Sequence, residues 1–452
     1  MPSAKVLRKT DPFVFDLIHR ESNRQTDGLE MIPSENYVSP SVLVAMGSIF
    51  TNKYSEGYPR KRYYGGNEIV DEVEELAIAR AKKLFGVEHV NVQPYSGSPA
   101  NLAVYLATCA PGDHVMGQSL TAGGHLTHGW KVSATGIFYQ SSQYGVMDKL
   151  VNGDLFDYDE IRSLAKKHKP KLIWVGATAY PLKFDYAKFA KIADEVGAYL
   201  AADIAHIAGL IVAGAHPSPV PHVHIVTTTT HKTLRGPRGA MIMVTKKGVT
   251  KDPDLPGKVD RAVFPGLQGG PHDHTTAAIA VALREASTPS FRTYGKQIVK
   301  NAQALGKALV KEGFVLVAGK TENHLILVDL TNRLGPGGGV FMQLALDKIG
   351  ISLNKNTIPG EPGSPFYPSG VRLGTPCVTT RGMKEKEMKR IASWYKKVLE
   401  EIADKRLPGE KEARIAYLKT FRKEIDHNKT LAKIRKEVTS LARRFPVPGI
   451  GK

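Results

Sequence analysis

The sequence predicts an α/β protein whose larger domain holds a mainly parallel sheet covered by helices. Strand-like apolar runs alternate with helical patterns along most of the chain, as in doubly wound folds. The runs at 171–177 and 198–203 are almost continuously apolar, which is typical of strands buried on both faces. The length of 452 residues exceeds what one hydrophobic core usually supports, so we expect a second domain.

Start and stop signals predict the first helices. An Asp-Pro pair opens a helix over residues 11–25, and a Ser-Pro pair at 39–40 gives the same signal of an N-cap followed by proline. Residues 67–85 place apolar side chains on one helical stripe, which Gly86 ends. That stripe consists of Ile69, Val73, Leu76, Ala77 and Leu84.

The central strands and the second domain follow in order. Strands are expected at 89–92, 171–177, 198–203, 224–230 and 239–245, with a helix after residue 96. From residue 290 onwards the pattern changes to a helix at 291–312, strands at 314–317 and 324–330, a loop at 354–370 and a charged helical tail at 381–446. We therefore predict an N-terminal arm (1–36), a large domain (37–290) and a small α/β domain with a basic helical tail (291–452).

Composition and charge restrict the class of protein. The formal net charge of +19 is compatible with a nucleic-acid surface, with an anionic ligand, or with a solvated basic surface. We favour the last, because the excess Lys and Arg lie mostly in amphipathic helical patterns. Cys109 and Cys377 can form neither a disulfide framework nor a metal-binding spacing, which predicts a reducing, cytoplasmic setting. No apolar stretch reaches the length of a membrane span.

One lysine stands apart from the many surface lysines. Lys232 follows the β-branched run at 224–230, and a lysine desolvated at a strand end can form a Schiff base. Pyridoxal phosphate needs such a lysine together with an acid that keeps its ring nitrogen protonated. Asp203 ends an apolar strand and suits that role, although a turn or helix-cap acid is an equal reading from spacing alone.

Two further motifs suit the same cofactor. Ser96-Gly97-Ser98 precedes a helix and offers hydroxyls and free N–H groups to a phosphate, although it also reads as an ordinary cap. His125 and His128 lie in a glycine-rich turn. A metal site there is disfavoured, because no acidic or cysteine partners are expected to cluster with these histidines. A histidine stacked on a cofactor ring fits better, and a satisfied loop histidine remains the alternative for His128.

Two charged residues suit an amino-acid substrate. Arg372 follows the long loop, and arginine binds carboxylates with two parallel hydrogen bonds, although a structural ion pair explains it equally well in isolation. Glu56 lies among four tyrosines, where a carboxyl group with a raised pKa can act as acid or base. A solvated loop glutamate is the alternative.

Nine long motifs, taken in order, resemble the serine hydroxymethyltransferase family over nearly the whole chain. They are IPSENY (32–37), FTNKYSEGYPRKRYYGG (50–66), NVQPYSGSPAN (91–101), GGHLTHG (123–129), DIAHIAGL (203–210), VTTTTHKTLRGPRG (226–239), FPGLQGGP (264–271), NKNTIP (354–359) and SGVRLGTP (369–376). The resemblance implies the fold-type I, aspartate-aminotransferase-like architecture and pyridoxal 5'-phosphate as cofactor.

The resemblance also implies a role for each matching residue. Catalysis is assigned to Lys232, Glu56, His231, Tyr64 and Thr229. Cofactor contacts are Ser96, Gly97, Ser98, His125, Thr178, Asp203, His206, His231, Lys232 and, from a second subunit, Gly270. The amino-acid substrate is assigned to Ser34, Tyr54, Glu56, Tyr64 and Arg372, and the pterin to Leu120, Gly124, Leu126 and Asn356. No metal is expected.

The implied reaction is the reversible transfer of a hydroxymethyl group between L-serine and tetrahydrofolate or a modified tetrahydropterin, by a homodimer or homotetramer with shared active sites. Two rivals use the same scaffold: an aldolase for β-hydroxy amino acids, and an α-methylserine hydroxymethyltransferase. A rival of another class is a polyanion- or RNA-binding role for the basic tail. The tail's aromatic residues Trp394, Tyr417 and Phe421 have apolar neighbours and are predicted to be core, which leaves no platform for base stacking.

Overall fold

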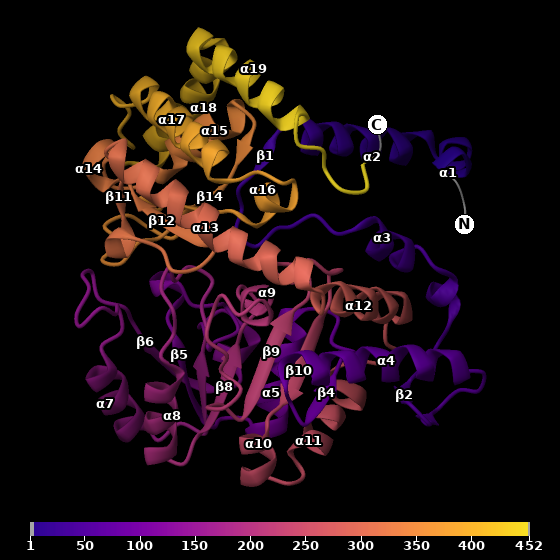
Figure 1. Cartoon of the computed structure of the whole chain (residues 1–452). Coiled ribbons are helices and arrows are strands. Elements are labelled where there is room, and N and C mark those ends of the chain that lie inside the picture. The colour runs from indigo at the N-terminus through magenta and orange to yellow at the C-terminus, as the bar shows by residue number, and fades with distance from the viewer. Residues whose placement is uncertain (1–3, 451–452) are drawn as a thin grey trace. The chain divides into compact units, whose positions relative to one another are not determined.

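The chain forms two compact units, which are described separately. The computed structural model describes residues 4–450, so the first three residues of the predicted arm and the last two of the predicted tail lie outside the described residues. The larger unit is Val38–Lys296, and the smaller unit combines Met1–Tyr37 with Gln297–Lys452. The N-terminal segment thus belongs to the unit that the C-terminal part forms (Figure 1).

A seven-stranded sheet forms the centre of the larger unit. Its strand order is β4-β10-β9-β8-β7-β5-β6. The strands are β4 (His89–Asn91), β5 (His114–Gln118), β6 (Gln140–Tyr144), β7 (Leu172–Val175), β8 (Tyr199–Asp203), β9 (Ile225–Thr229) and β10 (Ala240–Val244). All pairs from β6 to β9 are parallel, and β10 is antiparallel to both β9 and β4. The predicted fold class, with its mainly parallel sheet, is confirmed.

Helices flank this sheet, as Figure 1 shows. They are α3 (Pro40–Met46), α4 (Glu68–Phe85), α5 (Gly97–Thr108), α6 (Ala134–Ile137), α7 (Tyr158–His168), α8 (Tyr186–Glu195), α9 (Ala208–Val212), α10 (Lys246–Lys251), α11 (Leu255–Arg261) and α12 (Asp273–Ala286). Every residue of β7, β9 and β10 is buried, including the three threonines of β9. The core between α5 and the sheet includes the large side chains of Tyr105 and Trp174.

The predicted helix starts are confirmed. Asp11 caps α2 (Pro12–Asp27) by accepting a hydrogen bond from the Val14 N–H at 3.0 Å. Ser39 caps α3 in the same way, with the Val42 N–H as donor at 3.2 Å. In both helices proline occupies the first turn, where its missing N–H leaves no hydrogen bond unmade.

The predicted apolar stripe of α4 was wrong in part. Ala77 is buried, but Ile69 and Leu76 are 62% and 45% exposed, and the buried face carries two acids, Asp71 and Glu74, beside its apolar residues. Periodicity failed here because these acids bind a buried arginine, Arg62, so polar groups occupy the inner face of the helix. The helix nevertheless ends as predicted, at Gly86 in the left-handed conformation.

The smaller unit contains a four-stranded antiparallel sheet with the order β11-β12-β15-β14. The strands are β11 (Val315–Leu316), β12 (Leu325–Asp329), β14 (Asn354–Asn356) and β15 (Gly370–Gly374). The predicted 354–370 loop therefore begins with a short strand. A two-stranded sheet joins β1 (Leu29–Glu30) to β13 (Ile351–Ser352) in parallel.

The helices of this unit are α1 (Ala4–Thr10), α2, α14 (Thr331–Leu334), α15 (Gly339–Lys348), α16 (Pro376–Thr380), α17 (Glu385–Glu401), α18 (Lys411–His427) and α19 (Lys429–Arg443), and the unit boundary falls within α13 (Pro289–Lys311). Trp394 and Phe421 are each 1% exposed and Tyr417 packs against the same core, so the helical tail offers none of these three aromatics as a stacking platform. Cys377 is a buried free thiol. Within residues 4–450, no helix combines the length and apolarity that a membrane crossing requires.

Candidate active site

The loop between β9 and β10 carries Lys232 and is held rigidly. The Thr230 hydroxyl donates to the Pro237 carbonyl at 2.6 Å, and the Thr233 hydroxyl donates to the His206 carbonyl at 2.9 Å. Both threonines are fully buried, which keeps these hydrogen bonds away from competing water. Lys232 itself is half-buried between them, at the carboxyl end of the sheet where open α/β folds place their sites.

Asp203 ends the neighbouring strand β8 and is held as a carboxylate. Its Oδ2 accepts hydrogen bonds from Asn101 Nδ2 at 2.9 Å and from His128 Nε2 at 3.3 Å, while Oδ1 accepts one from the Ala205 N–H at 3.0 Å. Burial acts to raise the pKa of Asp203, but the hydrogen bond from His128 and the charge of Lys232 outweigh it. The pKa therefore lies below its ordinary value.

A second layer of contacts orients the donors to Asp203. Asn101 Nδ2 also donates to Thr127 Oγ1 at 2.8 Å, and Asn101 Oδ1 accepts from Thr227 Oγ1 at 2.7 Å. The His128 ring stacks on Trp174, with 5.2 Å between centroids and 11° between planes. Sequence reasoning missed Asn101, although a polar residue inside the apolar run of α5 is a usable signal.

His125 lies beside this cluster with a neutral ring. Its Nδ1 is 2.7 Å from Thr127 Oγ1, and burial lowers the pKa of His125 to about 4. Candidate ligand atoms of His125, His128 and Asp203 all lie within 4.8 Å of one another. The expectation that these histidines have no acidic partner was therefore wrong, because the fold supplies Asp203 from another strand. That carboxylate already accepts three hydrogen bonds, so the geometry fits an acid kept ionised for a ring nitrogen.

The start of α5 and the end of β9 form a cradle with unused polar atoms. A Cβ on Gly97 would lie 2.8 Å from the Thr229 methyl carbon, so only glycine brings this backbone so close to β9. The Thr229 hydroxyl and His231 Nδ1 are buried and have no hydrogen-bond partner within the described residues. Such orphaned groups are uncommon in native proteins and suit a polar ligand. Ser96 and Ser98 are exposed at this helix N-terminus, where a phosphate is favoured.

The remaining predicted cofactor contacts are Thr178, His206 and Gly270. The Thr178 hydroxyl donates to the carbonyls of Gly123 and Gly124 at 3.1 and 3.0 Å, so it braces the histidine turn. His206 is 5% exposed. The Gly270 carbonyl accepts a hydrogen bond at 2.6 Å from the hydroxyl of Tyr95, the residue directly before Ser96.

Glu56 lies within a second cluster on the larger unit. The Tyr54 hydroxyl is 3.4 Å from Glu56 Oε1, and the Tyr54 and Tyr64 rings meet edge to face with centroids 5.1 Å apart. A Cβ on Gly269 would lie 2.9 Å from Glu56 Oε1, and one on Gly270 would touch the Tyr54 ring at 3.3 Å. The structure thus gathers Tyr54, Glu56, Tyr64 and Gly270, with both tyrosine rings largely open to solvent.

The other predicted contacts are distributed over both units. Arg372 on β15 is 9% exposed, and its Nε donates to Asn354 Oδ1 at 3.0 Å; burial lowers the pKa of Arg372 to about 10, which leaves it charged at neutral pH. Asn356 lies on β14, and Ser34 is half-buried. Leu120, Gly124 and Leu126 lie in the turn that carries His125, and Leu126 is 45% exposed.

An ionised acid ends one strand of a mainly parallel sheet and a lysine follows the adjacent strand, beside a neutral histidine and a helix N-terminus with two exposed serines. This combination suits a cofactor with a pyridine ring, a reactive carbonyl carbon and a phosphate arm. The fold and the cluster together define a pyridoxal-phosphate enzyme of fold type I.

Comparison with known proteins shows which family of fold-type I enzymes the chain resembles. The family model for serine hydroxymethyltransferase matches residues 7–395. A serine hydroxymethyltransferase of Sorangium cellulosum is 55% identical over 99% of this chain and 97% of that protein. Those of Acidothermus cellulolyticus and of a Nitratiruptor strain are each 53% identical, over 99% and 98% of this chain and 98% of each relative. The chain belongs to the serine hydroxymethyltransferase family, which confirms the resemblance seen in the sequence.

Membership of this family makes the chain an enzyme of one-carbon metabolism. Its reaction interconverts serine and glycine with transfer of the one-carbon unit to tetrahydrofolate. The family uses pyridoxal phosphate as its cofactor.

Proposed function

We propose that this chain performs the serine–glycine reaction with pyridoxal phosphate bound covalently to Lys232 in the cluster around Asp203. The observation that carries this proposal is the pair of buried, unpartnered atoms, Thr229 Oγ1 and His231 Nδ1, beside a carboxylate fixed by three donors. When bound, the cofactor ring accepts the electrons of the bond that is broken.

Around that cofactor, the residues of the larger unit have distinct tasks. Asp203, whose pKa is lowered, holds a proton on the ring nitrogen. His125 stays neutral and lies against one face of the ring, while Ala205 and His206 line the other. The phosphate is bound by Ser96, Gly97 and Ser98, helped by Gly270 of a second copy, with Thr178 near the phenolic oxygen.

The substrates are bound by a second set of side chains. Arg372 binds the serine carboxylate through its planar fork, which burial keeps free of competing water. Ser34, Tyr54 and Tyr64 assist it. Glu56 moves the proton of the serine hydroxyl as the bond between the α and β carbons breaks. The tetrahydropterin contacts are Leu120, Gly124, Leu126 and Asn356.

We propose in addition that the enzyme is a homodimer or homotetramer in which Glu56, Tyr54, Tyr64 and Gly270 serve the active site of a second copy. Exposed large apolar side chains on the same unit support an interface. They are Leu43, Val44, Ile49, Ile69, Leu76 and Leu106. A sedimentation-equilibrium measurement tests the assembly, and a monomer at micromolar concentration would contradict it. Two free cysteines support a reducing, cytoplasmic setting for this enzyme.

Glycine production from serine tests the proposed function. The purified chain, supplied with pyridoxal phosphate and tetrahydrofolate, is expected to release glycine at a rate that falls sharply without tetrahydrofolate. Lys232→Ala should abolish this rate, and the exposed Lys246→Ala should retain it. Equal rates with and without tetrahydrofolate, or an active Lys232→Ala variant, would contradict the proposal.

A further inference from the structure

A short hairpin carries Glu56 at its base. Strand β2 (Gly57–Tyr58) pairs antiparallel with β3 (Lys61–Arg62), and Glu56 directly precedes the first strand. The Glu56 carbonyl accepts a hydrogen bond from the Tyr63 N–H at 2.9 Å. The side chain of Glu56 thus projects from a backbone whose direction is set by this hairpin.

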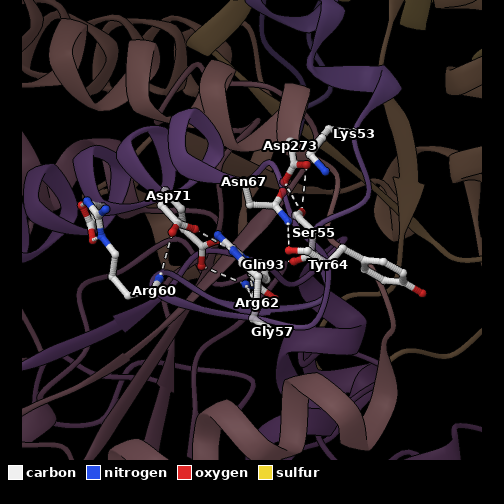
Figure 2. Close-up of polar contacts among 12 residues, drawn as sticks. Lys53, Ser55, Gly57, Arg60, Arg62, Tyr64, Asn67, Asp71, Gln93 and Asp273 are labelled. Carbon is white, nitrogen blue, oxygen red and sulfur yellow. Dashed lines mark hydrogen bonds and ion pairs between the residues drawn. The ribbon is translucent and has the colours of Figure 1, made fainter.

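Arg62 fixes the peptide groups on both sides of Glu56. Its Nη1 donates at 2.9 Å to the Ser55 carbonyl and at 2.9 Å to the Gly57 carbonyl. Figure 2 shows the guanidinium lying against this backbone. With the Tyr63 bond, three consecutive carbonyls are therefore held, and Glu56 has little freedom to rotate about its backbone.

The guanidinium is itself anchored by two acids of α4. Nε lies 2.8 Å from Asp71 Oδ1, and Nη2 lies 2.6 Å from Glu74 Oε2. The side chains of Arg62, Asp71 and Glu74 are 3%, 8% and 2% exposed. Ion pairs this deeply buried are strongly directional, because each unmade hydrogen bond leaves a charge without water.

Two further buried contacts close the cluster around the same backbone. Gln93 Nε2 donates to the Gly57 carbonyl at 2.9 Å and to Glu74 Oε1 at 2.8 Å. The Ser55 hydroxyl donates to the carboxylate of Asp273 at 2.8 Å. Gln93 follows β4 and Asp273 begins α12, so together with α4 three segments distant in the sequence converge on the residues that flank Glu56 (Figure 2).

We propose that Arg62 is a positioning residue for the Glu56 carboxylate: held by Asp71 and Glu74, its guanidinium fixes the two carbonyls that flank Glu56. The inference rests on the proposed role of Glu56 in proton transfer. Only arginine supplies the four hydrogen bonds in this planar arrangement, and lysine retains the charge but not the fork. A shift of the carboxylate by about 1 Å is enough to slow catalysis about a hundredfold.

Arg62→Lys tests the positioning, with Arg60→Lys as the matched control. Arg60 lies in the same hairpin, but its guanidinium is exposed and pairs with Glu75 on the surface. For Arg62→Lys we expect kcat for glycine production to fall roughly 10- to 100-fold while the KM for serine and the cofactor absorbance stay near their normal values. The control should keep kcat. Equal kcat for Arg62→Lys and wild type would overturn the proposal.

A double-variant cycle with Glu56→Gln separates positioning from a general structural role. If Arg62 acts through Glu56, Arg62→Lys should lower kcat less than about twofold once Glu56 is replaced. A full additional loss in the Glu56→Gln background would overturn the positioning role and leave the proposed function intact. A Glu56→Gln enzyme with normal kcat would instead contradict the proposed role of Glu56 itself.

A second variant, Glu74→Gln, keeps the proposal testable if Arg62→Lys fails to fold. If Arg62→Lys lacks cofactor absorbance or sediments abnormally, Glu74→Gln takes its place in the cycle. It preserves the side-chain size and removes one of the two anions bound to Arg62. We expect a several-fold loss of kcat that again disappears in the Glu56→Gln background. An undiminished kcat, or a loss that persists there, would overturn the proposal.

Discussion

Replacing Asn101 by leucine should loosen the carboxylate at the centre of the candidate active site. Leucine keeps the branched shape of asparagine and suits the interior of α5, but its two methyl groups are larger than the amide, so overpacking at this buried position adds to the loss of hydrogen bonds. What disappears is a set of three hydrogen bonds, at 2.9 Å to Asp203, at 2.8 Å to Thr127 and at 2.7 Å from Thr227. All three partners keep their burial and lose a donor or acceptor.

The magnitude follows from these contacts. A hydrogen bond to a charged group contributes about 1.5–3 kcal/mol, and each neutral one about 0.5–1.5 kcal/mol. The leucine side chain offsets part of the loss by burying apolar surface. A net destabilisation of about 3 kcal/mol remains, which lowers the Tm of a unit of this size by roughly 6–12 °C. The pKa of Asp203 should rise, because the charged form loses one donor.

Thermal unfolding and cofactor titration measure both effects. Asn101→Leu is compared with Asn332→Leu, which changes an exposed asparagine on α14. We expect a large fall in Tm together with weaker binding of pyridoxal phosphate for Asn101→Leu alone. If its Tm and cofactor affinity match those of the control, the hydrogen bonds of Asn101 do not hold Asp203 in place and the account of this cluster fails.

Three further predictions concern other parts of the molecule. Burial lowers the pKa of His224 to about 4, and its Nδ1 accepts from the Leu200 N–H. The unfolded chain binds this proton near pH 6.5, so the free energy of unfolding should fall by up to about 3 kcal/mol between pH 6.5 and pH 4. His224→Gln should flatten that fall in urea titrations, and an unchanged slope would refute the assignment. Gly97→Val should push against Thr229 and weaken cofactor binding at least tenfold in a spectroscopic titration, since even a Cβ would lie 2.8 Å from its methyl carbon; unaltered affinity would show that the cradle is not used. Arg372→Lys should raise the KM for serine about 10- to 100-fold with cofactor absorbance unchanged, because lysine cannot form the two parallel hydrogen bonds; a normal KM would exclude Arg372 from carboxylate binding.

Much of the fold could be predicted because its signals are local. The strands β7, β8 and β10 are nearly continuous apolar runs and β9 is a β-branched run, and burial of their central residues on both faces explains these patterns. The helix starts marked by Asp-Pro and Ser-Pro pairs could be recognised equally well from the sequence. The buried face of α4 could not be recognised in this way. Hydrophobic periodicity assigns Asp71 and Glu74 to the solvent-facing side, but in the structure both bind a buried arginine.

The candidate site also has parts that could be predicted from the sequence and parts that could not. Lys232 and Asp203 were recognisable from their positions after apolar strands, and the family motifs supplied most other positions. The contacts that hold them were not recognisable. Asn101 meets Asp203 across 102 residues of sequence, and Ser55 meets Asp273 across 218. Polar contacts between distant segments leave no periodic trace in either partner, so only the folded chain reveals them.

The most direct test of the central claim is to locate the covalent attachment of the cofactor. The purified chain is incubated with pyridoxal phosphate, reduced with sodium borohydride and digested, and the modified peptide is identified by mass spectrometry. The account predicts a single dominant modification on Lys232, with little modification of any lysine in Lys232→Ala. Modification of another lysine as the dominant product, or none at all, would contradict the claim that this cluster is the cofactor site.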